Sequence, residues 1–154
     1  MKILVTLFLF VSSFCIGQDS SSTKSSIKDF EELITESFEK KINKRINRRL
    51  NGTEYRLLVI TSGSLNQRIT IPRYLQQVFI SWGINKSQLS KSVVLFISKS
   101  KSKLKLYIGN EVTKIISKDD KKKILEEEIE PKIEKSDFKG AIANGVKAIL
   151  NFFK

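Results

Sequence analysis

The sequence contains very few side chains that can carry out chemistry. It has no histidine, and its single cysteine, Cys15, and single methionine, Met1, both lie in the first 17 residues. Beyond that segment, a Ser-His-Asp triad, a cysteine nucleophile and a zinc site of the usual kind cannot be built. A bound metal would have to be held by oxygen ligands, which favours Ca²⁺ or Mg²⁺.

One place to look for chemistry is the segment YIGNEVTK, which spans Tyr107 to Lys114. A short apolar run ends there at Gly109, and loops just past a strand end are where α/β proteins usually keep their functional residues. Glu111 is the only acid in the segment. The segment is therefore either part of a working site or a surface turn with a solvated glutamate.

The N-terminal residues have the layout of a secretory signal peptide, assigned to residues 1–17. The charged start Met1-Lys2 precedes an apolar run from Ile3 to Ile16, and small residues then predict cleavage between Gly17 and Gln18. The run is too short to span a bilayer, and the bulky residue before Cys15 disfavours lipid attachment there. We expect a periplasmic or secreted protein without a transmembrane anchor.

The chain is strongly basic, with a net charge of +12. Its positive residues gather in three runs, at 40–49, 99–103 and 118–123. Aromatic residues do not interleave with these runs, so we expect no nucleic-acid partner. A solvated cationic surface is the simpler interpretation, and weak attraction to anionic lipid or cell-wall polymer is the alternative.

The polar, serine-rich residues 18–25 are expected to form a flexible lead into one domain, 26–154. A long amphipathic helix is predicted from an N-cap at Ser26, with Asp29 in its first turn, to the stop signal Asn51-Gly52. Its apolar positions recur every three to four residues, at Ile27, Phe30, Ile34, Phe38, Ile42, Ile46 and Leu50.

Three further segments read as strands. Residues 54–62 and 92–98 are continuously apolar at their centres, which is typical of strands buried on both faces of a sheet. Residues 104–109 alternate between apolar and polar side chains, and a short polar turn joins them to the preceding strand in a predicted hairpin.

Three more helices are predicted, at residues 70–83, 117–130 and 136–153. Trp82 belongs to the apolar stripe of the first and is assigned to the core. The second should end before Pro131, because the residue preceding a proline resists helical geometry. In the last, Gly145 indicates close packing against a neighbour. The element order predicts an α/β fold, an α/β/α layered sandwich with a small mixed sheet of three to four strands and helices on both faces.

The segment from Ile115 to Leu150 resembles the end of the TPM domain, a family that includes thylakoid lumen acid phosphatases and a photosystem repair factor. Members typically carry V-G-Y-G-L-E, and later P-x-F-x-x-G-D-Y-x-x-G-I-x-x-G. Gly109 takes the place of the first of these glycines, and Trp82-Gly83 stands where the family has a W-x-G turn. Without a gap, the P, D, Y, I and last G of the second motif fall on Pro131, Asp137, Phe138, Ile142 and Gly145, and Gly140 stands one residue before the position of the preceding glycine.

The matched residues have structural explanations that require no chemistry. Pro131 terminates a helix, and Asp137 accepts hydrogen bonds from the free amide groups at the start of the next one. Gly140 and Gly145 permit close helix packing. The resemblance extends over residues 27–152, and it is loose before Trp82.

The resemblance also implies a cleft at the strand ends, where carboxylates hold a divalent cation. In this chain the three acidic positions of the family are occupied by Lys91, Thr113 and Lys118. A lysine in place of a carboxylate puts a positive charge where a cation should bind, which opposes binding electrostatically.

Glu111, together with Asp119 or Asp120, is the remaining candidate set of metal ligands. A solvated turn at Glu111 and first-turn helix positions for the two aspartates are the simpler interpretation.

The sequence therefore favours an exported, TPM-like, non-catalytic protein that acts through protein contacts in the cell envelope with an unknown partner, and no cofactor is expected. The alternatives are an acid-phosphatase-type hydrolase, which would be a phosphomonoesterase, and a weak Ca²⁺- or Mg²⁺-binding domain. The hydrolase would need an oriented nucleophile and charge neutralisation, for which the sequence offers no histidine, cysteine or acid cluster.

Overall fold

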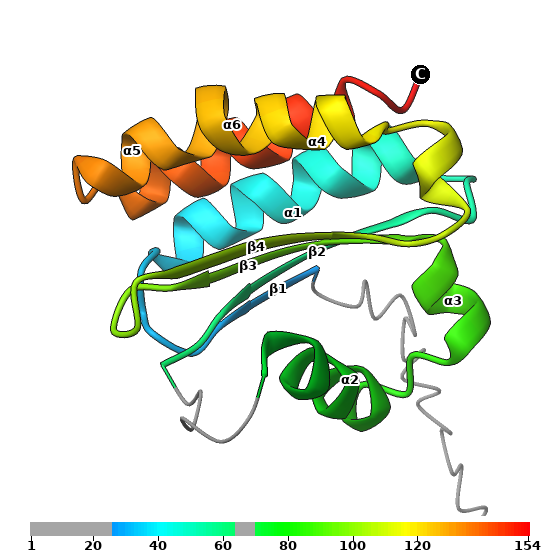
Figure 1. Ribbon diagram of the computed structural model, residues 1–154, viewed down its shortest axis with the longest axis horizontal. Helices are drawn as coiled ribbons and strands as arrows, with labels where there is room; N and C mark the ends of the chain where they lie inside the picture. Colours follow the sequence, from blue (N-terminus) through cyan, green and yellow to red (C-terminus); the bar gives the residue numbers. More distant parts are fainter. Residues whose placement is uncertain (1–25, 64–69) are drawn as a thin grey trace, which may run out of the picture.

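The structure is a computed structural model that describes residues 26–63 and 70–154 (Figure 1). The predicted signal cleavage between Gly17 and Gln18 and the lead at 18–25 lie outside the described residues. Within the described part of the chain, no helix is long and apolar enough to cross a membrane.

The centre of the molecule is a four-stranded mixed sheet in the order β1-β2-β3-β4. Its strands are β1 (Ile27–Asp29), β2 (Arg56–Thr61), β3 (Ser92–Ser98) and β4 (Lys103–Ile108). The first three strands are parallel, and β4 returns antiparallel beside β3 through the predicted hairpin. The mixed sheet and the strands at 54–62, 92–98 and 104–109 are therefore confirmed.

Helices cover both faces of the sheet, as predicted (Figure 1). On one face, α1 (Glu36–Leu50) and α6 (Phe138–Leu150) pack against alternate residues of β2 such as Val59. On the other, α2 (Ile71–Ser81) packs against the intervening residues, such as Ile60, and α3 (Lys86–Ser90) follows it. Every residue of β3 is buried, which explains its continuously apolar sequence.

The two parallel crossovers have opposite hands. The chain steps in the same direction across the sheet from β1 to β2 and from β2 to β3. The first connection passes through α1 on one face, and the second passes through α2 on the opposite face. One of the two crossovers is therefore left-handed, a departure from the strong right-handed preference of such units.

The predicted start of the first helix was wrong. Residues 27–29 form the short strand β1, and α1 begins only at Glu36, capped by Thr35, whose hydroxyl accepts from the Phe38 N–H. Asp29 caps no helix: its carboxylate accepts from the Thr61 hydroxyl and from the Ile34 N–H (2.9 Å). These residues form a strand and not the start of a helix because Ile27 pairs with Val59 of β2 and is buried there.

The prediction that a helix ends before Pro131 was also wrong. The chain stays helical from α4 (Lys118–Lys123), through a π-helical segment (Ile124–Ile129), into α5 (Glu130–Glu134). Proline has no N–H and its ring clashes with the carbonyl four residues earlier, so an ordinary α-helix would break there. The wider π turns precede Pro131 and place it in the first turn of α5, where proline is tolerated.

The remaining helix boundaries agree with the sequence. α2 is followed by Trp82 and by Gly83, which adopts a positive φ of 64°. The short helix α3 was not predicted, although Asn85 and Gln88 form a reciprocal capping box at its start.

Candidate functional site

Three segments meet where the resemblance places a metal cleft. Lys91 immediately precedes β3, Glu54 lies just before β2, and the loop after β4 holds Glu111 and Thr113. Because β2 and β3 are parallel and β4 is antiparallel to β3, these segments share one end of the sheet. The strand tips expected to carry the chemistry are thus close together in the fold.

Lys91 forms an ion pair at this end. Its Nζ lies 2.6 Å from Oε2 of Glu54, and its side chain is only 21% exposed, whereas that of Glu54 is 79% exposed. The hydrogen bond with Glu54 raises the pKa of Lys91, and the charges of Glu54 and Glu111 act in the same direction while partial burial opposes them. Lys91 is therefore a protonated cation held against a carboxylate. Glu54 was missed by sequence reasoning, because one acid ahead of a strand has no distinguishing pattern.

The loop of Glu111 is a docked turn. The Glu111 carboxylate accepts from the Ser90 hydroxyl (2.9 Å), and its N–H donates to the Ser90 carbonyl (2.9 Å). Thr113, in the 3-10 turn Val112–Lys114, donates to the carbonyl of Asn110 (2.6 Å). Both side chains therefore have local hydrogen-bond partners.

Gly109 permits this docking by close approach. A Cβ at this position would lie 2.5 Å from the carbonyl oxygen of Leu89 and nearer still to that of Ser90. Backbone atoms cannot move aside as a flexible side chain can, so only glycine fits. The loop that follows β4 and holds Glu111 is thus packed against the corner between α3 and β3.

Asp119 and Asp120 occupy the first turn of α4, as predicted. The Asp120 carboxylate accepts from the N–H (3.0 Å) and hydroxyl (2.6 Å) of Ser117, while the Ser117 hydroxyl accepts from the Asp120 N–H (3.1 Å). The hydrogen bond from the Ser117 hydroxyl is the main cause that lowers the pKa of Asp120. Over residues 26–63 and 70–154, no three histidine, cysteine or acidic side chains gather in a way that could hold a metal ion.

The matched motif residues in the C-terminal helices have structural partners. The Asp137 carboxylate accepts from the Gly140 N–H (2.8 Å) and caps α6. The Lys99 ammonium lies 5.6 Å from the ring centre of half-buried Phe138. At Gly145, a Cβ would lie 2.9 Å from Cδ1 of Ile129, which confirms close helix packing. At Gly140, the space is limited instead by the capping carboxylate of Asp137.

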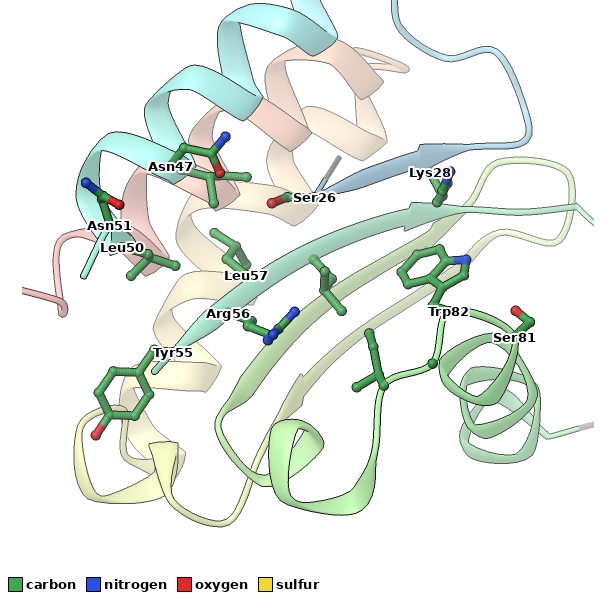
Figure 2. Close-up of a pocket in the computed structure, with 14 residues that line it drawn as sticks. Ser26, Lys28, Asn47, Leu50, Asn51, Tyr55, Arg56, Leu57, Ser81 and Trp82 are labelled. Atoms are coloured by element: carbon green, nitrogen blue, oxygen red, sulfur yellow. The ribbon is translucent and has the colours of Figure 1, made fainter. Parts of the chain in front are cut away.

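A groove of about 710 Å³ lies beside β2, next to the strand-tip cluster but distinct from it (Figure 2). Figure 2 shows Asn47, Leu50 and Asn51 projecting from α1 on one side of β2, with Trp82 at the end of α2 on the other. Lys28 and Arg56 supply positive charge to its lining, and none of the described lining residues is acidic. Trp82, assigned to the core from sequence, is half-buried and forms part of this wall.

The comparisons with known proteins agree with the architecture. The family model of the TPM domain matches residues 27–152. No curated protein matches the chain.

Three solved structures share the fold. The N-terminal domain of a P. gingivalis protein is 14% identical, with a TM-score of 0.72 over 86% of this chain and 83% of that chain. The BA42 protein of the psychrophilic bacterium Bizionia argentinensis is 17% identical, with a TM-score of 0.65 over 80% of this chain and 83% of that chain. The N-terminal domain of the cg2496 protein of Corynebacterium glutamicum is 10% identical, with a TM-score of 0.64 over 89% and 85%.

Proposed function

This chain belongs to the TPM domain family, and from that membership we propose that it is an exported, non-catalytic member that acts through contacts with other proteins in the cell envelope. The observation that carries the proposal is the ion pair between Lys91 and Glu54 at the strand tips. A positive charge is built into the position where the family resemblance implies a metal-binding carboxylate.

The chemistry of the neighbouring side chains supports this proposal. A divalent cation would meet the charge of Lys91, whose pKa is raised, and it would have to compete with that ammonium for Glu54. Ca²⁺ takes six to eight oxygen ligands. Glu111 is engaged with the Ser90 hydroxyl, and Asp120 is engaged in the cap of α4. Phosphoryl transfer would further need an oriented nucleophile and charge neutralisation. The Ser90 hydroxyl is engaged with Glu111, and the charge of Lys91 is already paired with Glu54.

The groove beside β2 supports the protein-contact part of the proposal. It combines surface from the half-buried aromatic side chains of Trp82 and Tyr55 with the cationic side chains of Lys28 and Arg56. Such a lining suits a partner segment that presents apolar groups together with carboxylates. The export part rests on the signal-like residues 1–17.

Two assays on the purified mature chain test the non-catalytic part. We expect no turnover of p-nitrophenyl phosphate at acidic pH, with or without Mg²⁺ or Ca²⁺, and no change in melting temperature with millimolar Ca²⁺. The combined variant Lys91→Asp and Thr113→Glu, which restores two acidic positions, should gain a Ca²⁺-dependent rise in melting temperature, because a ligand stabilises only the state that binds it. Sustained turnover by the unaltered chain that Lys91→Ala abolishes would refute the proposal.

Site-specific crosslinking in the native host tests the protein-contact part. A photoreactive amino acid at Ser81, which lines the groove, should give a discrete crosslinked product, and the same group at exposed Gln77, outside the groove, should not. Equal crosslinking at the two positions would show that the groove is not the contact surface.

A further inference from the structure

A second, strongly basic hollow lies between α1 and α6, on the opposite face of the sheet from α2. The two helices run side by side above the sheet (Figure 1). Their C-terminal halves enclose a groove of about 250 Å³, which we call the arginine groove and which is lined by Arg45, Arg48, Arg49, Lys147, Leu150 and Asn151.

The four cations of this groove have no acidic partner in the described part of the chain. All four side chains are exposed, none of the ion pairs among the described residues includes them, and no described residue that lines the groove carries a carboxylate. On α1, Arg48 and Arg49 follow Arg45 by three and four residues. Like charges at these spacings destabilise a helix. The negative ends of α1 and α6 offset part of this repulsion.

Arginine is concentrated at this place. The chain has 22 lysines and only six arginines, yet three of the six stand at positions 45, 48 and 49. A guanidinium group presents a planar fork of donors that matches the oxygens of a phosphate in pairs, whereas a lysine ammonium acts as a point charge. Three such forks beside an acid-free hollow form an arrangement suited to phosphate oxygens.

The basic surface continues along α1 beyond the groove. A shallower hollow, lined by Lys40, Asn43, Lys44, Asn47, Arg48 and Asn51, shares Arg48 and Asn51 with it. Lys44 and Arg48 lie one turn apart, so successive cations follow each other at about 6 Å along the helix axis. A ligand that repeats its negative charge along its length can contact both hollows at once.

Two observations narrow the class of polyanion. Among the residues that the structure describes, no aromatic side chain lines either hollow, so these hollows offer nucleic-acid bases no aromatic ring to stack on. Over residues 26–63 and 70–154, the exposed large apolar residues are Phe30 and Ile80, and neither lines these hollows. This surface therefore lacks the apolar anchors of a membrane-binding helix in the described part of the chain. We propose that the arginine groove binds the phosphate groups of a linear phosphate polymer, which lies along α1 towards Lys44.

Binding of inorganic polyphosphate to the mature chain tests this proposal, with a charge-matched control. The test variant combines Arg45→Gln, Arg48→Gln and Arg49→Gln, and the control combines Lys114→Gln, Lys118→Gln and Lys123→Gln, three exposed lysines outside both hollows. We expect the test variant to lose at least about tenfold in affinity, and the control less than about threefold. The magnitude of the slope of log affinity against log salt concentration should fall by about two to three in the test variant, because each removed charge eliminates one phosphate contact.

The proposal is overturned if both variants lose affinity equally, because the attraction would then depend on net charge alone. It is also overturned if the unaltered chain binds vesicles of anionic phospholipid but not polyphosphate. Circular dichroism and melting curves verify that the variants are folded. If the test variant does not fold, the single change Arg48→Lys, which keeps the charge and removes the fork, should weaken binding more than Lys118→Arg; no difference between these two would overturn the proposal.

Discussion

Lys91 and Glu54 come from different segments and neutralise one another at the strand tips. The Lys91 side chain is 21% exposed, and the hydrogen bond with Glu54 raises its pKa, so the ammonium is protonated at neutral pH. A mobile cation at the same place would be repelled by this charge while its carboxylate ligand was already occupied. The strand tips thus carry a lysine ammonium at a position where the family resemblance implies a carboxylate.

Gly109 is the residue that holds the loop of Glu111 in place, and it offers a sharp test. We predict that Gly109→Ala destabilises the protein by about 1–3 kcal/mol, because the added methyl group would collide with the carbonyl oxygens of Leu89 and Ser90. Urea denaturation measures the change. Asn110→Ala, at the exposed neighbouring position, is the control and should be nearly neutral.

Lys121 predicts a dependence of stability on alkaline pH. Partial burial lowers its pKa in the folded protein, and the charge of Lys105 adds to the effect. The folded state therefore binds this proton less readily than the unfolded state, so this site destabilises the fold below its folded pKa and stops doing so as pH rises towards the unfolded value.

The variant Lys121→Met isolates this contribution from those of the other lysines. It should be more stable than the unaltered chain at pH 7, and the difference should shrink as pH rises towards 10. Urea midpoints at a series of pH values measure it. A difference that stays constant with pH would show that packing, and not charge, is responsible.

At the scale of elements, the α4-to-α5 helix depends on how closely α6 can approach it. Gly145 allows that approach, since its missing Cβ leaves room for Ile129 and Leu95. The π-helical segment places Ile129 fully inside the core just before Pro131. An irregular helix and a glycine in the facing helix thus form one packing unit.

Substitutions at Gly145 test this packing unit. We predict that Gly145→Val destabilises the protein by about 1–3 kcal/mol through overpacking. Gly145→Ala should cost much less, because alanine gains about 1 kcal/mol of helix propensity and the Ile129 side chain can shift slightly. Thermal unfolding of both variants provides the comparison. Equal stability of the valine variant and the unaltered chain would mean that the gap at Gly145 is not close-packed.

Most elements could be predicted because their signals are local. The apolar run of β3, the caps at Ser117 and Asp137 and the stop at Gly83 each lie within a few residues of the structure they specify. β1 could not be predicted, because a three-residue strand is defined by its partner Val59, which is distant in sequence.

The candidate site shows the same division between local and distant signals. The positions of Lys91 and Thr113 were identified through the family motif, but their surroundings were not. The partner Glu54 and the groove beside β2 arise from contacts between elements, which no spacing within the sequence reveals.

At the scale of the whole molecule, both ends of the sheet are closed by carboxylates that lie far from their partners in sequence. Opposite the end with Lys91, the Glu31 carboxylate accepts from the N–H groups of Lys99 (2.8 Å) and Ser100 (3.0 Å) and from the Ser100 hydroxyl (2.6 Å). It therefore ties the segment after β1 to the turn between β3 and β4, across the end of β2. These three hydrogen bonds of Glu31, which we call the clamp, hold the end of the short strand β1 against the sheet.

Removal of the clamp should loosen β1 more than the rest of the sheet. We predict that Glu31→Ala lowers the free energy of unfolding by about 1–2 kcal/mol, because a charged hydrogen-bond acceptor is lost. The partial exposure of Glu31 to water keeps this loss smaller than it would be at a buried site. Glu134→Ala, at an exposed position outside the clamp, should change stability by less than about 0.5 kcal/mol. Amide hydrogen exchange should show faster opening at Phe30, whose N–H donates to the Thr61 carbonyl, than at residues of β3. Uniform loss of protection over the sheet would instead show that β1 opens only with the whole molecule.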